Sequence, residues 1–350
     1  MRILVTGGAG FIGSHTCLAL LEKGHEIIVI DSYVNSNPES LNRVVQLLKL
    51  KQHVDNVNIR IFKADIRDES TLDQLFYQYK ESGKPIQAVI HFAGLKSVND
   101  SVLNPLLYWD ANVSSSVKLF KVMNKYKCKT IVFSSSATIY GITNDTSLLE
   151  DSEVKPINPY GNTKAAIELI LNDIFDSNPE EWRIANLRYF NPIGAHSSGM
   201  IGEDPIGLPS NIFPFITKVA VGQIEKLMIF GNDWPTNDGT GVRDYIHVMD
   251  LAEGHIAALE FLINSKSQII NLNLGNGIGT SVLKLVKTFE KVNNIEIKFE
   301  FANRRIGDCC SVIADNSMAL SCLDWKPKRS LEEMCIDGWS WQSLNPDGYK

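Results

Sequence analysis

The fold is indicated most strongly by the stretch Ile3-Leu4-Val5-Thr6-Gly7-Gly8-Ala9-Gly10-Phe11-Ile12-Gly13. Its apolar first residues predict a strand, and its glycines fit G-x-G-x-x-G through Gly8, Gly10 and Gly13, or G-x-x-G-x-x-G from Gly7. Such glycines allow a tight turn and let a pyrophosphate approach the backbone amides and the positive end of the following helix. A glycine-rich turn without a ligand is the alternative. Because an apolar-periodic helix follows, the stretch predicts a dinucleotide-binding unit.

An acidic residue ends the second predicted strand, Ile27–Asp31. A carboxylate at this place accepts hydrogen bonds from the ribose hydroxyls of NAD and repels the additional phosphate of NADP. A solvated loop acid is the alternative for Asp31 taken alone. Together with the glycine-rich turn, Asp31 predicts NAD as the cofactor.

Short β-branched runs alternate with amphipathic stretches through the first half of the chain, which is typical of βαβ units and a parallel sheet. The predicted strands are Ile3–Thr6, Ile27–Asp31, Ile59–Lys63, Ala88–His91, Thr130–Ser134 and Ile184–Arg188. The predicted helices cover about 11–23, 40–52, 69–80, 104–126 and 160–176. Six strands with five crossovers indicate an α/β fold with a doubly wound parallel sheet of the Rossmann type.

After Phe190 the chain becomes rich in glycine and proline, as at Gly199, Gly202 and Pro205, which indicates loops outside the sheet. Helical patterns follow at about 249–263, 280–292 and 331–342, with strand-like runs at Ile269–Leu274 and Ile297–Phe301. We expect a Rossmann domain at 1–190, to which the chain returns at about 240–272. A smaller, discontinuous α+β lobe within 191–350 is expected to bind the substrate.

Composition narrows the class of protein. The 350 residues carry a net charge of −6, with 44% hydrophobic and 21% charged residues, which argues against disorder, collagen and coiled coil. An acidic chain without a long Lys/Arg block is a poor candidate for nucleic-acid binding, and no apolar run approaches the about 18 residues of a membrane span. The first strand leaves no room for a targeting segment, and the six cysteines lack disulfide-scaffold or metal-site spacing. We expect a cytoplasmic protein with reduced thiols and no nucleic-acid, membrane or metal partner.

Acid–base chemistry is indicated by a Tyr-x-x-x-Lys pattern at Tyr160 and Lys164. Asn158 can cap a helix that starts at Pro159, which places Tyr160 in the first turn and Lys164 one turn later on the same face. An ammonium near a phenol favours the phenolate and lowers a pKa that starts near 10, toward that of a general base.

The run Ser134-Ser135-Ser136-Ala137-Thr138 at the end of the fifth predicted strand supplies hydroxyls beside this pair. Ser136 or Thr138 can hydrogen-bond the substrate oxygen that loses its proton. A surface Tyr/Lys pair beside a serine-rich turn is the alternative.

These residues resemble the extended short-chain dehydrogenase/reductase superfamily and, within it, the UDP-glucose 4-epimerase family. The resemblance covers nearly the whole chain, in the blocks Val5–His15, His91–Lys96, Ser134–Gly141, Leu187–Pro192, Gly241–Val248 and Arg304–Asp308. It implies one tightly bound NAD and inversion of C4 of a nucleotide sugar. Hydride leaves C4 for the nicotinamide as a tyrosine removes the 4-hydroxyl proton, and the 4-keto sugar takes the hydride back on its other face.

The resemblance assigns roles residue by residue. Tyr160 is similar to the catalytic base, Lys164 to its partner, and Ser136 or Thr138 to the hydroxyl oriented on the sugar. The implied NAD-binding residues are Gly7, Gly10, Phe11, Ile12, Gly13, Asp31, Asn35, Ser36, Asp65, Ile66, Phe92, Ala93, Lys96, Asn112, Tyr160, Lys164, and Tyr189 or Phe190. The implied substrate-binding residues are Lys96, Ser136, Tyr160, Asn191, Asn211, Arg243, Arg305, Asp308 and Val312.

Two guanidinium groups, those of Arg243 and Arg305, suit the diphosphate of a UDP-sugar, although either arginine alone is more typical of a surface ion pair. Asp308 can accept a hydrogen bond from a ribose hydroxyl. Val312 is similar to a gate beside the C2 substituent of the sugar, and its modest size suggests the hypothesis that UDP-N-acetylglucosamine and UDP-N-acetylgalactosamine are also substrates.

Two alternative functions remain open. A nucleotide-sugar 4,6-dehydratase shares the glycine turn, Tyr160 and Lys164, but needs an acid pair where this chain has Ser136-Ala137-Thr138-Ile139. A non-catalytic NAD-binding sensor or scaffold is expected to have lost the tyrosine or the lysine. By resemblance, we also expect a homodimer through the helices at about 104–126 and 160–176, whose outward faces can form a four-helix contact.

Overall fold

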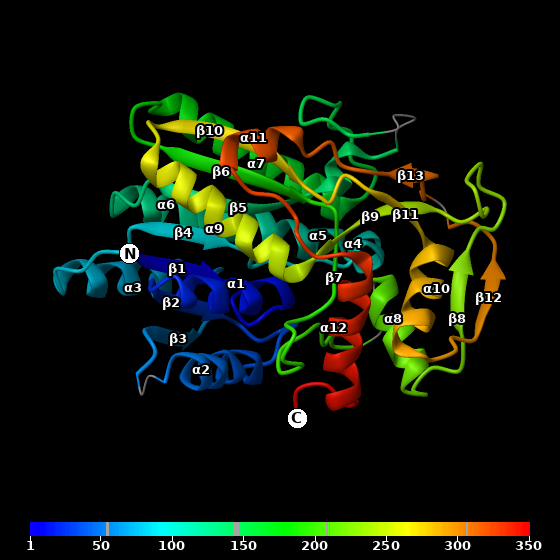
Figure 1. The fold of residues 1–350 in the computed structure, drawn as a ribbon. Helices are drawn as coiled ribbons and strands as arrows, with labels where there is room; N and C mark the ends of the chain where they lie inside the picture. The colour runs from blue at the N-terminus through cyan, green and yellow to red at the C-terminus, as the bar shows by residue number, and fades with distance from the viewer. Residues whose placement is uncertain (54–55, 143–146, 208, 210, 306) are drawn as a thin grey trace.

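The structure is a computed structural model that describes residues 1–53, 56–142, 147–207, 209, 211–305 and 307–350. A seven-stranded sheet with the order β10-β6-β5-β4-β1-β2-β3 crosses the molecule, and every pair of neighbours in it is parallel (Figure 1). Its strands are β1 (Arg2–Thr6), β2 (Glu26–Asp31), β3 (Ile59–Lys63), β4 (Ala88–His91), β5 (Thr130–Ser136), β6 (Arg183–Tyr189) and β10 (Gln268–Leu274). The predicted doubly wound α/β fold is confirmed. The predicted count of six strands is one short, because β10 returns to pair with β6 at the edge of the sheet.

Apolar strands of this kind are stable only when helices cover both faces of the sheet, and they do. One face packs against α1 (Phe11–Glu22), α2 (Glu39–Gln52), α9 (Val248–Asn264) and α11 (Ser317–Leu323). The other packs against α3 (Glu69–Glu81), α6 (Ser115–Lys125) and α7 (Pro159–Ser177). Ile3, Leu4 and Val5 of the central strand have no exposed surface.

The helix predicted at 104–126 is not a single regular α-helix. The chain forms α4 (Val98–Leu103), α5 (Pro105–Tyr108), a π-helical segment η1 (Trp109–Ser114) and then α6. The break before α5 falls at Asn104, whose backbone is non-helical, because the proline that follows disfavours the helical conformation at the residue before it. The periodicity correctly predicted α6, the C-terminal part of this region. It did not predict α4 or the π-helical segment η1.

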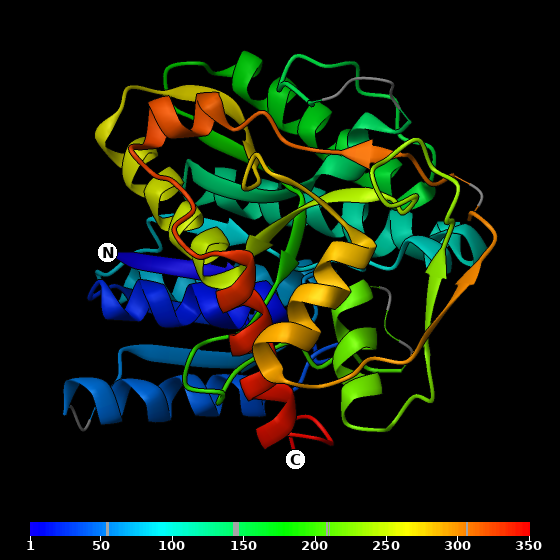
Figure 2. The same cartoon turned by 45° about the vertical axis from the view of Figure 1, so that its right-hand side comes forward.

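The second part of the molecule combines helices with short strands, as expected for an α+β lobe (Figure 2). A four-stranded sheet joins β7 (Asn191–Ile193), β9 (Val242–His247), β11 (Gly279–Ser281) and β13 (Ser311–Val312), and β8 (Leu227–Phe230) pairs with β12 (Phe299–Ala302). The helices α8 (Ile212–Ala220), α10 (Val282–Asn293) and α12 (Leu331–Leu344) share an apolar core with these strands. The predicted helix at 280–292 starts later than expected, because Gly279–Ser281 pairs with β9 as β11.

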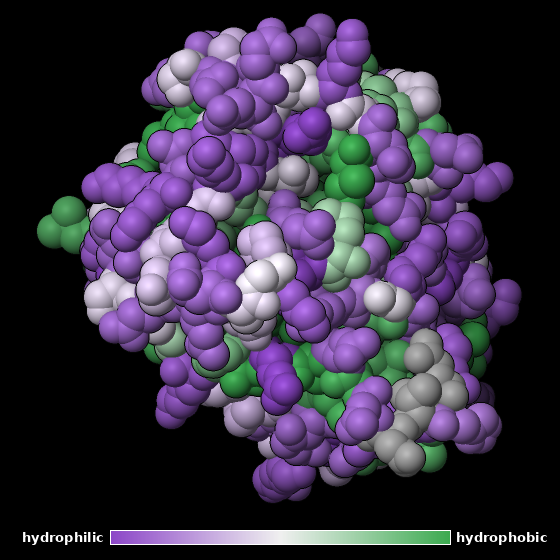
Figure 3. All heavy atoms as spheres, turned by 90° about the vertical axis from the view of Figure 1, so that its left-hand side faces the viewer, coloured by the Kyte–Doolittle hydropathy of each residue, from purple (hydrophilic) through white to green (hydrophobic). Residues whose placement is uncertain are grey.

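The surface at the amino ends of the large-sheet strands is covered mainly by hydrophilic side chains, with apolar ones in small separate areas (Figure 3). None of the helices in the described ranges is long and apolar enough to cross a membrane.

Candidate active site

A cavity lies at the carboxyl ends of the central strands, where ligands bind in doubly wound folds. Its wall includes most of the residues expected to bind NAD. These are Gly7, Gly10, Phe11, Ile12, Gly13, Asp31, Asn35, Ser36, Asp65, Ile66, Phe92, Ala93, Lys96, Tyr160, Lys164 and Tyr189. The fold thus brings the glycine turn, the acid after β2 and the Tyr160/Lys164 pair to one site.

The glycine turn lets α1 point its amino end at the cavity. Gly7 has a φ of +69°, and a Cβ on it would lie 2.7 Å from the backbone nitrogen of Ala93, so only glycine fits there. Gly10 caps α1 without a side-chain hydrogen bond, and the first turn of this helix contains no acidic residue. The amides of the first turn therefore suit an anionic group such as a pyrophosphate.

Asp31 is a buried acid that organises the loop after β2. Its carboxylate accepts hydrogen bonds from Ala9 N at 2.9 Å, Tyr33 N at 2.9 Å and Ser36 Oγ at 2.7 Å. The acid therefore ties the glycine turn to the segment that forms the next part of the cavity wall. The negative charge and hydroxyl-rich surroundings fit a ribose with a free 2′-hydroxyl.

The helix that carries Tyr160 begins as predicted. The side chain of Asn158 accepts a hydrogen bond from Gly161 N at 2.8 Å, and Pro159 is the first residue of α7. Lys164, one turn later, donates from Nζ to the Ser134 carbonyl oxygen at 2.6 Å, and its Nζ lies 5.9 Å from the centre of the Tyr160 ring. The lysine thus links α7 to the carboxyl end of β5.

The expected lowering of the Tyr160 pKa by the ammonium is wrong for this structure. Burial raises the pKa of Tyr160, and a hydrogen bond with Ser136 opposes this effect without cancelling it. Burial likewise lowers the pKa of Lys164 to about 8, against the effect of Glu168. Desolvation outweighs the charge of Lys164 here because Lys164 is buried, Tyr160 is half-buried in the cavity wall, and the ammonium is directed at Ser134.

The two hydroxyls at the end of β5 lie together. The oxygen of Ser136 accepts hydrogen bonds from Thr138 N at 3.2 Å and from Thr138 Oγ1 at 3.0 Å, within the short helix η2 (Ala137–Tyr140). Ser136 therefore bridges Thr138 and Tyr160, and its hydroxyl is positioned for an oxygen bound beside the phenol.

Two residues expected to bind NAD, Asn112 and Phe190, are not part of the cavity wall that the described residues form. Asn112 is buried, accepts from Leu95 N at 2.7 Å, and donates to Leu95 O at 3.1 Å and Thr163 Oγ1 at 3.0 Å. Its amide therefore ties the loop after β4 to α7. Phe190 is part of a small buried cluster with Ile139 and Tyr140.

The residues expected to bind the substrate divide into two groups. Arg243 and Asp308 approach to 3.4 Å, and Arg243 also donates to Cys309 O at 3.0 Å. The guanidinium of Arg305 lies 3.8 Å from the centre of the Phe230 ring and interacts electrostatically with Arg243 and Asp308. These residues belong to the α+β lobe, with Val312 on β13 beside Arg243 and Asn191 on β7 across β9.

The second group meets at Glu203, which the sequence analysis missed. Its Oε1 accepts from Lys96 Nζ at 3.0 Å and from Asn211 Nδ2 at 3.2 Å. Glu203 lies in the loop-rich segment after β7, where no periodicity marks a functional acid. Other cavity residues not predicted from the sequence are Ser32, Val34, Asn37, Ala64, Arg67, Gly94, Leu95, Leu107, Ala111, Ser134, Gly202, Asp204, Pro205 and Tyr349.

No group of three or more potential metal ligands occurs among the residues that the structure describes. The site combines a dinucleotide-binding turn, an acid after β2, and a half-buried tyrosine beside a buried lysine and a serine hydroxyl. This combination defines the class of extended short-chain dehydrogenases/reductases.

Comparison with known proteins narrows the class. Residues 4–337 match the sequence model of a family described as GDP-mannose 4,6 dehydratase. The chain is 51% identical to the UDP-glucose 4-epimerase of Bacillus subtilis over 350 residues, covering 100% of this chain and 99% of the relative. It is 50% identical to UDP-glucose 4-epimerase 2 of Arabidopsis thaliana, covering 99% of this chain and 96% of the relative.

Two solved structures with a similar fold are also UDP-glucose 4-epimerases. The fold matches a UDP-glucose 4-epimerase from Stenotrophomonas maltophila, crystallised with NAD and formylated UDP-arabinopyranose, with a TM-score of 0.93 and 42% identity over 99% of both chains. It matches the Bifidobacterium longum enzyme in complex with NAD+ and UDP with a TM-score of 0.91 and 43% identity, over 99% of this chain and 100% of the other. The chain belongs to the UDP-glucose 4-epimerase family.

Proposed function

We propose that this protein is an NAD-dependent isomerase that interconverts UDP-glucose and UDP-galactose by inverting C4 of the sugar through a 4-keto intermediate. The observation that carries this function is the meeting of Tyr160, Lys164 and the glycine turn in one cavity. The chain belongs to the family that is named for this reaction, and we propose that the reaction serves galactose metabolism.

The polar groups in the cavity wall are chemically suited to bind NAD. The first-turn amides of α1 suit the pyrophosphate, Asp31 suits a ribose, and Tyr160, Lys164 and Tyr189 surround the opposite end of the cavity. Bound NAD supplies the carbon that accepts hydride from C4 and returns it to the other face of the 4-keto sugar.

Side chains of the protein transfer the proton of the sugar 4-hydroxyl. The phenolate oxygen of Tyr160 removes the proton of the 4-hydroxyl as C4 is oxidised, and returns it when C4 is reduced. Ser136 hydrogen-bonds Tyr160 and orients the sugar hydroxyl. Burial outweighs the charge of Lys164 in this structure, so we infer that the ammonium, 5.9 Å from the centre of the Tyr160 ring, favours the phenolate only as the 4-hydroxyl proton is transferred.

We infer that Arg243 and Arg305 bind the diphosphate and Asp308 a ribose hydroxyl, with Asn191 and Asn211 contributing further hydrogen bonds. The support is that the two guanidinium groups and the carboxylate interact within one lobe. We also propose that residues 1–190, with the returning segment predicted at about 240–272, form the NAD-binding domain, and that the rest of 191–350 forms the substrate lobe. Within the returning segment, β9 pairs with strands of the lobe, whereas α9 and β10 pack with the large sheet. The contribution of β10 to the large sheet supports this division.

The function is tested by incubating the purified protein with UDP-galactose, without added NAD, and following UDP-glucose in a coupled assay. We expect conversion by the unsubstituted chain and a loss of about 10²–10⁴-fold in Tyr160→Phe, with NAD content unchanged. Absence of conversion in both, also with added NAD, contradicts the proposal. Release of a 4-keto-6-deoxy sugar instead identifies a 4,6-dehydratase, and NAD binding without turnover of any UDP-sugar identifies a sensor or scaffold.

We further propose that the protein is a homodimer. Leu103 and Leu106 on α4 and α5 are 78% and 82% exposed, and Leu169 on α7 is 62% exposed. Because α4 and α5 pack against α7, these apolar side chains lie on neighbouring helices. Two copies can bury them in a four-helix contact.

We infer a cytoplasmic location from the thiols. The described part of the chain contains no disulfide bond, and Cys17, Cys128 and Cys335 are buried in apolar surroundings. Buried, reduced cysteines are typical of a reducing compartment.

A further inference from the structure

We propose that residues 345–350, which follow α12, act together with Arg43 as a clasp that retains the dinucleotide, with Tyr349 as the positioning residue. The proposal rests on NAD being the bound cofactor of the proposed function. It concerns how long NAD stays bound, and not the chemistry at the sugar.

Tyr349 connects two walls of the cavity that are distant in sequence. Its hydroxyl accepts from Gly202 N at 3.0 Å and donates to Gly202 O at 3.2 Å, and its backbone nitrogen donates to Asp204 Oδ2 at 2.9 Å. On the other side, its carbonyl oxygen accepts from Asn37 Nδ2 at 2.9 Å. Tyr349 and all three of these partners line the cavity.

The clasp closes a defined end of the cavity. Asn37 follows Ser36, whose hydroxyl is bonded to Asp31, and an acid at the end of β2 takes the adenosine ribose in doubly wound folds. Tyr160 and Lys164 belong to the opposite, nicotinamide end. The bridge from Asn37 through Tyr349 to Asp204 therefore lies beside the adenosine half of the cofactor.

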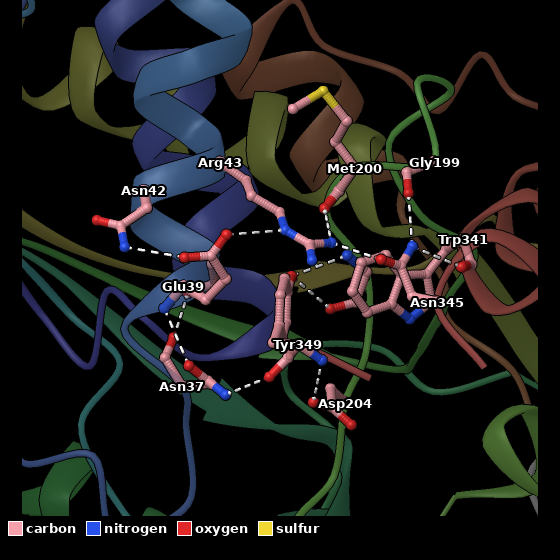
Figure 4. A network of polar contacts seen from close by, with 12 residues as sticks. Asn37, Glu39, Asn42, Arg43, Gly199, Met200, Asp204, Trp341, Asn345 and Tyr349 are labelled. Atoms are coloured by element: carbon pink, nitrogen blue, oxygen red, sulfur yellow. Dashed lines mark hydrogen bonds and ion pairs between the residues drawn. The ribbon is translucent and has the colours of Figure 1, made fainter. Parts of the chain in front are cut away.

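Arg43 on α2 holds this segment in place (Figure 4). Its Nη1 donates to Asn345 Oδ1 at 2.6 Å and to Met200 O at 3.2 Å, and Glu39 orients it through an ion pair at 3.2 Å. Its guanidinium lies 5.1 Å from the centre of the Tyr349 ring. Arg43 thus touches both ends of the clasp and the loop that leads to Gly202.

The close approach of residues 345–350 to Asp204 depends on Gly348. Gly348 has a φ of +78°, and a Cβ on it would lie 2.3 Å from both carboxylate oxygens of Asp204. Any other residue at this position must push the segment away from Asp204. Gly348→Ala is therefore a direct way to open the clasp without touching Tyr349 itself.

Opening the clasp requires little more than breaking these contacts. They join a short segment to two loops and to the Arg43 side chain on α2, and none of them lies within the large sheet, so the segment can open locally at much lower cost than global unfolding. Release of the cofactor then depends on how often the clasp opens.

The experiment measures NAD release from the purified holoenzyme. The protein is diluted into cofactor-free buffer, and free NAD is assayed in the filtrate over time for the unsubstituted chain, Tyr349→Phe, Gly348→Ala and Arg43→Gln. The matched control is Tyr245→Phe, since the buried Tyr245 hydroxyl has no hydrogen-bond partner among the described residues.

We expect release about tenfold faster in Tyr349→Phe, which detaches the segment from Gly202 alone, and about a hundredfold faster in Gly348→Ala and Arg43→Gln, each of which loosens the segment at more than one place. Tyr245→Phe is expected to match the unsubstituted chain. In all variants the far-UV circular dichroism spectrum is expected to match that of the unsubstituted chain, which a general structural defect does not allow.

Release rates within twofold of the unsubstituted chain in all three clasp variants overturn the proposal. A parallel fall in kcat at saturating NAD and in the urea midpoint, without faster release, also overturns it and assigns the segment to folding alone. Failure of the proposed function is separate: a protein that binds NAD but does not convert UDP-galactose still reports the release rate. A protein that binds no NAD overturns both.

Discussion

The ammonium of Lys164 donates a hydrogen bond to the carbonyl oxygen of Ser134 over 2.6 Å. This contact joins α7 to the carboxyl end of β5, so the helix that carries Tyr160 is tied to the strand that carries Ser136. Lys164 is itself buried, and burial lowers its pKa to about 8.

This pKa predicts an alkaline limit to activity. A lysine with a lowered pKa is charged below about pH 8 and loses its proton as the pH rises through that value. We expect kcat/KM for UDP-galactose to decline above about pH 8, because the Tyr160 phenolate loses its neighbouring positive charge. In Lys164→Met the rate is expected to be lower by about 10²–10⁴-fold and this alkaline decline to be absent. An unchanged decline in the methionine variant assigns the titration to another group.

Removing the acid after β2 is expected to weaken NAD binding. Asp31 accepts hydrogen bonds from Ala9 and Ser36, so Asp31→Ala disturbs the turn and removes the charge, whereas Asp31→Asn removes mainly the charge. We expect Asp31→Asn to raise the Kd for NAD about tenfold and to lower the preference for NAD over NADP. Titration of cofactor-stripped protein with both dinucleotides measures this. An unaltered preference means that Asp31 does not contact the ribose.

The buried ion pair beneath the site is expected to matter for stability. Arg188 donates to Glu168 Oε2 at 2.7 Å and to Tyr140 OH at 2.9 Å, and both charged side chains are almost fully buried. Arg188→Met leaves the Glu168 carboxylate without its partner, and we expect the free energy of unfolding to fall by about 3–5 kcal/mol. Urea unfolding measures the change. As a control, Lys125→Met removes the exposed partner of Asp73 and is expected to have little effect.

The size of residue 312 is expected to control acceptance of N-acetylated sugars. Val312 pairs with Arg243 across β13 and β9, next to the arginine assigned to the diphosphate. We expect the unsubstituted chain to interconvert UDP-N-acetylglucosamine and UDP-N-acetylgalactosamine, and Val312→Tyr to lose this activity while keeping that on UDP-glucose within about tenfold. Undetectable conversion of the N-acetylated sugars at high concentrations of the unsubstituted enzyme refutes the hypothesis.

A charge in the exposed apolar surface is expected to separate the dimer. Leu106 is 82% exposed on α5, and Leu106→Glu adds a carboxylate that a four-helix contact has to desolvate. Sedimentation at micromolar protein is expected to show a dimer for the unsubstituted chain and a monomer for the variant. A monomeric unsubstituted chain rules out the dimer.

Signals within a few residues of each other were sufficient to predict much of the wall of the cavity. The glycine turn, Asp31 after a buried strand, and the Asn158 cap before Tyr160 each depend on local backbone geometry, which nearby side chains decide. The periodicities of strands and helices likewise placed the elements of the doubly wound sheet. Asn112 is the exception, since it lies outside the cavity wall that the described residues form, and its buried partners, Leu95 and Thr163, are reached only through the fold.

Only the tertiary structure decided what closes the cavity and how its groups titrate. Glu203 meets Lys96, and Tyr349 meets Asn37, across long separations in sequence, and neither acid nor tyrosine carries a local pattern that marks it. The direction of the Tyr160 pKa also depends on burial, which outweighs the lysine one turn away. Sequence patterns thus determined the local units and the chemistry that they can support. Packing between distant segments determined which side chains share one site, because desolvation and long-range contacts exist only in the folded chain.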